Sequence, residues 1–168
     1  GTCRIGVNRV FTTEQGRAIT APNPDRFVDP DAGVLRIDEL DGTPYGCLVI
    51  YGCHPHVLGP ENTLISPDYP GSTRDVVEHL TGATCLFLQG AGGNICPLES
   101  FVKDTAVAER LGTVLGSEAT KVFLELETRP HETVLDYIIE SQAALGIMKK
   151  IPFPDQAPKF RTLTCNIA

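Results

Sequence analysis

The stretch YGCLVIYGC, residues 45–53, decides the fold of this 168-residue chain. Its apolar residues run almost without interruption over the length of one strand, which is typical of a central strand covered on both faces. Residues 34–40 (VLRIDEL) alternate apolar with charged side chains, and this alternation predicts a half-buried strand. Asp41 and Gly42 between the two stretches are a hairpin turn signal, so we expect the two strands to pair.

The segments after residue 53 alternate between helices and strands. Pro70 can occupy the first turn of a helix that ends at Gly82. Residues 83–88 predict a second central strand, and Asp104 can cap the longest helix. This alternation predicts an α/β fold, with a mixed β-sheet layered with helices. Around this core we expect strands at 3–10, 133–145 and 160–167, a surface loop at 11–33 and a Pro-rich loop at 149–159.

The composition excludes several classes of partner. Hydrophobic residues make up 42% of the chain and the net charge is −7, as in an ordinary globular protein. The basic residues are scattered and form no stripe with aromatic residues, which excludes a nucleic-acid-binding surface. No apolar run approaches the ~20 residues that cross a bilayer, so we expect no integral membrane segment.

The chain has six cysteines and no CxxC pair, which excludes a zinc ribbon. Cys47, Cys53, Cys85 and Cys165 lie in apolar, strand-like runs, where a cysteine behaves as a small buried hydrophobe. We therefore expect reduced thiols rather than a disulfide framework, and this usage favours a cytoplasmic location. The sequence shows no initiator Met and no signal segment, and we expect residues 1–168 to be one partial domain of a larger catalytic domain.

The first candidate site is CHPHVLG, residues 53–59, directly after the predicted central strand. Catalytic groups in α/β sheets gather beyond the carboxyl ends of the strands. The imidazole of His54 or His56 can bind zinc, and a spacing of two places both on one side of an extended chain. A histidine at a strand end can equally be a hydrogen-bonded structural group.

Two further segments could form a pocket with these histidines. Asp68 can cap the following helix, or it can orient a metal-bound histidine through a hydrogen bond. The loop LQGAGGNICP, residues 88–97, can direct backbone N–H groups at an anion or a developing oxyanion, or it can be a tight turn that needs glycine. Cys96 lies in this polar loop, so we expect it to meet substrate or to be a plain half-buried thiol.

Together these segments resemble the neutral/alkaline, non-lysosomal ceramidase family and its shorter bacterial relatives. The resemblance covers residues 29–125 and is carried by DPDAGVLRID (29–38), CHPHVLG (53–59), ISPDYPG (65–71) and FLQGAGGNICP (87–97). It implies a zinc-dependent hydrolase that cleaves the N-acyl amide bond of a small ceramide-like lipid with a metal-activated water. It places His54 as a zinc ligand, Cys96 and Asn94 in the catalytic motif, and His56, Asp68, Gln89, Gly90 and Gly93 around the pocket.

The sequence departs from the family pattern at two positions. Cys96 stands where the family motif has serine, and Asn94 stands where it usually has aspartate. The resemblance implies three further zinc ligands, a histidine, a glutamate and a tyrosine, which we expect outside this chain. Two alternatives stay open. One is a cysteine-dependent hydrolase in which His54 or His56 activates Cys96. The other is a catalytically incomplete domain that keeps only the fold, since catalytic zinc normally needs three protein ligands.

Overall fold

The computed structural model describes residues 1–154, which form two compact units, Gly1–Thr128 and the unit that begins at Arg129. The strand expected at 160–167 lies outside the described residues. The single partial domain expected over residues 1–168 stays a prediction, because a division into compact units does not by itself define separate domains.

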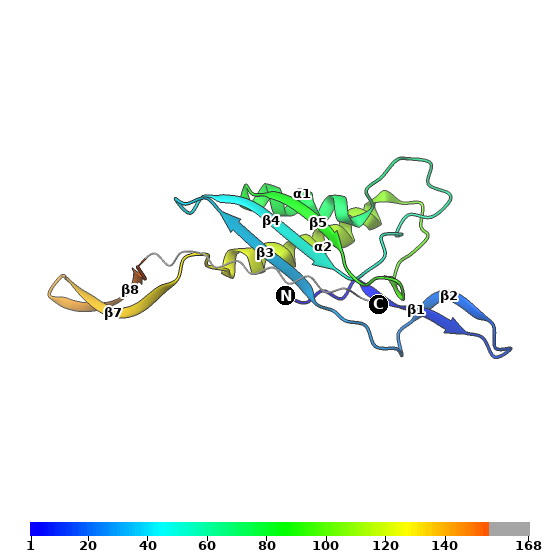
Figure 1. Cartoon of the computed structure of the whole chain (residues 1–168), viewed down its shortest axis with the longest axis horizontal. Coiled ribbons are helices and arrows are strands. Elements are labelled where there is room, and N and C mark those ends of the chain that lie inside the picture. Colours follow the sequence, from blue (N-terminus) through cyan, green and yellow to red (C-terminus); the bar gives the residue numbers. More distant parts are fainter. Residues whose placement is uncertain (155–168) are drawn as a thin grey trace, which may run out of the picture. The chain divides into compact units, whose positions relative to one another are not determined.

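The first unit is built on a mixed three-stranded sheet with the order β3-β4-β5 (Figure 1). The hairpin predicted at Asp41 and Gly42 joins the first two strands in antiparallel pairing, and β5 runs parallel to β4. The stretch at 45–53 is therefore the central strand, as predicted, whereas the second strand predicted as central lies at the edge of this sheet. The bounds are β3 Ala32–Asp38, β4 Pro44–Tyr51 and β5 Thr84–Gln89.

Two helices, α1 (Tyr69–Thr81) and α2 (Thr105–Glu125), pack on one face of this sheet. Val49 and Cys85 point from the sheet into this layer and meet Phe123 of α2 in a buried cluster. The mixed sheet layered with helices confirms the predicted fold class. The prediction that the central strand is covered on both faces is wrong for the described residues, because apolar side chains of the opposite face are exposed. These are Leu35, Ile37, Ile50, Leu86 and Leu88.

The helix ends match the signals in the sequence. The Asp68 side chain accepts a hydrogen bond from the Tyr69 N–H at the start of α1, and Gly82 ends the helix in the left-handed conformation with φ 72°. The Asp104 side chain accepts from the Ala106 N–H at the start of α2. These two carboxylates and one glycine therefore set where three of the four helix ends lie.

A second sheet with the order β2-β1-β6 lies beside the first. Its central strand pairs antiparallel with both neighbours. The expectation of a loop over residues 11–33 is wrong in part, because six of these residues form an edge strand. The glycine-rich loop after β5 likewise ends in a strand, not in open loop. The bounds are β1 Gly6–Thr12, β2 Ala18–Asn23 and β6 Ile95–Pro97.

The second unit contains a hairpin of β7 (His131–Glu140) and β8 (Ala143–Pro152). Ser141 and Gln142 at its turn have φ values of 50° and 69°, as in the two-residue turns that suit hairpins. One strand over residues 133–145 and a loop from residue 149 were expected. Both expectations are corrected. The turn at Ser141 and Gln142 falls inside residues 133–145, and β8 continues past residue 149 to Pro152.

Among the described residues, no helix is long and apolar enough to cross a membrane.

The helix pair packs closely through glycines on α2. A Cβ atom at Gly112 would lie 2.4 Å from the carbonyl oxygen of Tyr69, and one at Gly116 would lie 2.9 Å from that of Thr73. The Thr73 hydroxyl also donates to the Gly112 carbonyl at 3.2 Å. Because backbone lies against backbone here, no side-chain rotation can make room for a methyl group.

We predict that Gly112→Ala destabilises the first unit by about 2 kcal/mol, because overpacking outweighs the better helix propensity of alanine. Urea unfolding followed by circular dichroism measures the change. Ser117→Ala, at an exposed position on the same helix, is the matched control and should change stability by less than about 0.5 kcal/mol. Equal stabilities of the two variants would contradict this account of the helix contact.

Candidate functional site

The loops that follow β4 and β5 meet at the carboxyl-terminal end of these two strands. The backbone N–H of His54 donates to the carbonyl of Ile95 at 3.2 Å, and the N–H of Gly90 donates to the carbonyl of Tyr51 at 2.9 Å. The strands are parallel and end together at the register pair of Tyr51 and Gln89. Both loops therefore start from the carboxyl ends of neighbouring strands, and the expected meeting of the histidine segment with the glycine-rich loop is confirmed.

Glycines allow the two loops to approach so closely. A Cβ atom at Gly90 would lie 3.2 Å from the Cα of Gly52, and one at Gly92 would lie 3.0 Å from the backbone nitrogen of His54. Gln89 also holds this turn, because its side-chain amide donates to the carbonyl of Gly90 at 3.1 Å. Gly90 thus shapes the site by close backbone packing, and Gln89 does so by the hydrogen bond of its side chain.

The turn leaves four successive backbone donors unused. Within residues 1–154, the N–H groups of Ala91, Gly92, Gly93 and Asn94 make no hydrogen bond to another residue. Gly93 and Asn94 are exposed, so their donors are open to water or to a bound acceptor, whereas Gly92 is buried. The predicted ability of this loop to hold an anion is compatible with these free donors.

His54 and His56 lie side by side but in different surroundings. Their ring centroids are 4.9 Å apart. The exposed imidazole of His54 has no hydrogen-bond partner among the described residues. His56 is half-buried, its ring stacks on Phe101 at 4.7 Å, and its Nε2 lies 3.1 Å from Nη1 of Arg9. His54 is therefore the histidine that can offer a ring nitrogen to a ligand.

Arg9 of β1 is the residue that analysis of the sequence missed. Its Nε and Nη2 donate to the carbonyl of Gly93 at 3.1 and 2.8 Å, while Nη1 contacts His56. One guanidinium thereby connects β1, the histidine loop and the glycine-rich turn. Since arginine carries no acceptor and stays protonated, the Nε2 of His56 must accept, and the proton of the neutral ring lies on Nδ1.

The environment of His56 opposes its protonation. Burial is the main cause that lowers the pKa of its imidazole, and the neighbouring charges of His54 and Arg9 lower it further. Its Nδ1 is buried and has no hydrogen-bond partner within the described residues. His56 is thus a neutral side chain that supports the loop, and its Nε2 is not free for a metal.

Asp68 clamps the loop rather than orienting His54. Its carboxylate accepts from the N–H of Leu58 at 3.0 Å and from the N–H of Tyr69 at 2.8 Å. The residue has a φ of 55°, which is costly for a side chain other than glycine. These two hydrogen bonds account for its place, and the capping role expected for it is confirmed.

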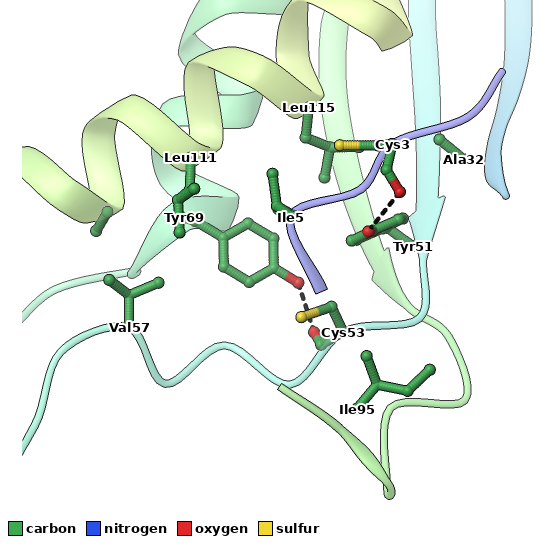
Figure 2. Packing of buried hydrophobic residues seen from close by; sticks show 11 residues of the cluster. Cys3, Ile5, Ala32, Tyr51, Cys53, Val57, Tyr69, Ile95, Leu111 and Leu115 are labelled. Atoms are coloured by element: carbon green, nitrogen blue, oxygen red, sulfur yellow. Dashed lines mark hydrogen bonds between the residues drawn. The ribbon is translucent and has the colours of Figure 1, made fainter. Parts of the chain in front are cut away.

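Two buried tyrosines anchor the chain beneath the site (Figure 2). The Tyr69 hydroxyl donates to the carbonyl of Cys53, the residue before His54, at 2.5 Å. The Tyr51 hydroxyl donates to the carbonyl of Cys3 at 2.9 Å. Burial is the first cause that raises the pKa of both phenols, so both remain donors at neutral pH.

Cys96 has a different environment from the one expected. It lies in β6, opposite Val7 of β1, and its side chain is 1% exposed. Burial raises the pKa of its thiol, although the Ser100 hydroxyl and the charge of Arg9 act against this shift. The expectation that this thiol meets substrate is therefore corrected, because a buried thiol is neither reachable nor readily ionised. The five cysteines of the described region are free, in agreement with the predicted reduced state.

The described residues contain no group of three or more metal-ligating side chains. A catalytic zinc site normally needs three protein ligands. His54 fits one ligand position by its exposure and its free ring nitrogens, whereas residues 1–154 alone do not make a complete site.

The fold is similar to that of two solved structures, a ceramidase complexed with C2 and the neutral ceramidase from Pseudomonas aeruginosa. Each comparison gives a TM-score of 0.58 at 19% sequence identity and covers 82% of this chain. The chain spans 24% of the length of each ceramidase chain. No family model and no curated protein matches the sequence. The chain therefore has the α/β fold of a fragment of a ceramidase, and at this identity the likeness shows the fold alone.

We predict that the free energy of unfolding decreases as the pH falls below 6.5, the ordinary pKa of histidine. The unfolded chain then binds a proton at His56 that the folded chain does not, so acid favours unfolding until the lower pKa of the folded state is reached. Urea unfolding at pH 7.5 and 5.5 measures the effect. The decrease in the free energy of unfolding between pH 7.5 and pH 5.5 should be smaller in His56→Gln than in the control His79→Gln. Equal decreases in the two variants would contradict the assignment of this effect to His56.

Proposed function

We propose that this chain forms part of the centre of a zinc-dependent hydrolase that cleaves the N-acyl amide bond of a ceramide-like lipid. The observation that carries the proposal is the unpartnered imidazole of His54 beside the turn at Gly92–Asn94. Support also comes from the fold, which is that of a fragment of two solved ceramidase structures. The substrate class is proposed from these neighbours and from the motifs at 53–59 and 87–97.

In this proposal His54 is one ligand of a zinc ion whose other ligands come from outside the described residues. A bound zinc ion would supply Lewis-acid chemistry to the amide. The backbone of this histidine is held at the carboxyl-terminal end of the sheet by its own hydrogen bond to Ile95 and by the hydrogen bond from Tyr69 to Cys53. Its position is thus set by the strands and by α1, not by a freely moving loop.

The free N–H groups of the turn are assigned to the carbonyl oxygen of the substrate. Donors that point at a developing negative charge stabilise it because they need no reorganisation during the reaction. Arg9 contributes by holding the Gly93 carbonyl with two of its nitrogens, which fixes the peptide unit between Gly93 and Asn94 and with it the Asn94 N–H. We assign Arg9 a positioning role in this site.

The cysteine-dependent alternative is less well supported by the geometry. Its nucleophile, Cys96, is buried in β6 and its pKa is raised mainly by burial. His56, one of the two bases considered, is engaged by Arg9. A domain that keeps only the fold stays a second candidate, because residues 1–154 contain no group of three metal-ligating side chains.

We predict that His54→Ala lowers the zinc affinity of the full-length protein at least about 10-fold and lowers amide hydrolysis with it, because it removes a direct ligand. Zinc content after dialysis and fatty-acid release from an N-acyl sphingosine are the two measurements. His79→Ala, which removes an exposed histidine at the end of α1, is the matched control and should retain both. Unchanged zinc content in His54→Ala would overturn the ligand assignment.

We predict that iodoacetamide leaves Cys96 unmodified in the folded protein and that Cys96→Ala retains activity, since the thiol is buried. Peptide mapping by mass spectrometry, before and after unfolding in urea, measures the modification. Rapid alkylation of the folded protein together with loss of turnover would support the cysteine-dependent hydrolase instead. Removal of zinc by a chelator should abolish activity only in the zinc-dependent case.

A further inference from the structure

A separate hollow of the first unit lies between the start of β1 and the segment that joins β2 to β3. Its volume is about 430 Å³. None of its lining residues belongs to the histidine loop or to the glycine-rich turn. The residues that matter for its chemistry are Arg4, Val7, Pro24, Arg26, Phe27 and Val28.

Two arginines line this hollow and bring positive charge to it. Arg4 and Arg26 both line it, and no carboxylate does. Within residues 1–154, neither side chain forms a salt bridge, whereas other cations such as Arg36 and Lys121 pair with acidic partners. Within residues 1–154 Arg17 and Arg74 form no salt bridge either, so what sets Arg4 and Arg26 apart is that both line one hollow that has no carboxylate in its lining. They favour an anionic ligand, because a guanidinium matches carboxylate and phosphate oxygens in geometry as well as in charge.

The remaining lining is apolar. Phe27 is 84% exposed, although a large aromatic side chain gains by burial, and Val28 beside it packs against the buried cluster of the first unit. Pro24 and Val7 add further apolar surface. A ligand that covered Phe27 would therefore need an apolar part next to its charged group.

We propose that this hollow binds an anionic amphiphile, a molecule with one carboxylate or phosphate head group and a short apolar chain. The head group lies between Arg4 and Arg26, and the chain covers Phe27 and Val28. This binding goes beyond the hydrolase proposed above and does not depend on it, because no residue of the hollow belongs to the site at His54.

The test is an NMR titration of the full chain with octanoate, octyl phosphate, octanol and inorganic phosphate, each below its aggregation concentration. Octanoate or octyl phosphate should bind saturably. Octanol, which lacks the charge, and inorganic phosphate, which lacks the chain, should each bind about tenfold more weakly or worse. Tighter binding of octanoate than of octyl phosphate would identify the natural head group as a carboxylate. Tighter binding of octyl phosphate would identify it as a phosphate. Equal binding of octanol and octanoate would overturn the proposal.

Variants localise the binding. Arg4→Gln and Arg26→Gln should each weaken the binding of the anionic probe by about threefold to tenfold, and raised salt should weaken it in the parent chain. Arg17→Gln, at an exposed arginine outside the hollow, is the matched control and should bind like the parent chain. Phe27→Ala tests the apolar half at an exposed position if Arg4→Gln does not fold.

Two outcomes separate this proposal from the hydrolase. His54→Ala should leave probe binding unchanged, because the hollow contains no residue of that loop. Loss of zinc or of hydrolysis in that variant with intact probe binding would leave the present proposal supported. Undiminished binding in both Arg26→Gln and Phe27→Ala would overturn it, whatever the activity at His54.

Discussion

The parallel alignment of β4 with β5 is the constraint on which the candidate site depends. Parallel neighbours cannot be joined by a tight turn, so the chain must cross over, and α1 is that crossover. Because of the crossover, both strands finish at the same end of the sheet, where Tyr51 and Gln89 are in register. If β5 ran the other way, the glycine-rich loop would leave from the opposite end of the sheet and could not reach His54.

The features that the sequence reveals are those with a local physical cause. An uninterrupted apolar run indicates the strand at 45–53, and short polar or glycine residues mark helix ends because they satisfy free backbone groups or adopt left-handed conformations. Asp104 and Gly82 are examples. The position of β5 at a sheet edge was not predictable in the same way, because the number of neighbours of a strand depends on segments far away along the chain.

Cys96 shows why the candidate site could be predicted only in part. Its polar and glycine-rich neighbours are typical of an open loop, yet residues 95–97 pair with β1 and bury the thiol. Arg9 was missed for a related reason. A single arginine in a strand carries no signal of its own, and its partner Gly93 lies 84 residues further along the sequence. Both errors concern contacts between β1 and the glycine-rich loop, which no local pattern encodes.

The same separation between Arg9 and Gly93 has a consequence for biosynthesis. The N-terminal strand leaves the ribosome long before its partners at residues 93–97 exist, since chains grow at about 5–20 residues per second. During that interval the backbone groups of β1 that later pair with β6 have no partner strand. The guanidinium of Arg9 also lacks the Gly93 carbonyl to which it later donates. The mixed sheet and its helices are also incomplete until α2 has been made. We therefore expect β1 to pair early with β2 and to dock late, and the edge that later receives β6 is where a nascent chain is most open to chaperones or to mispairing.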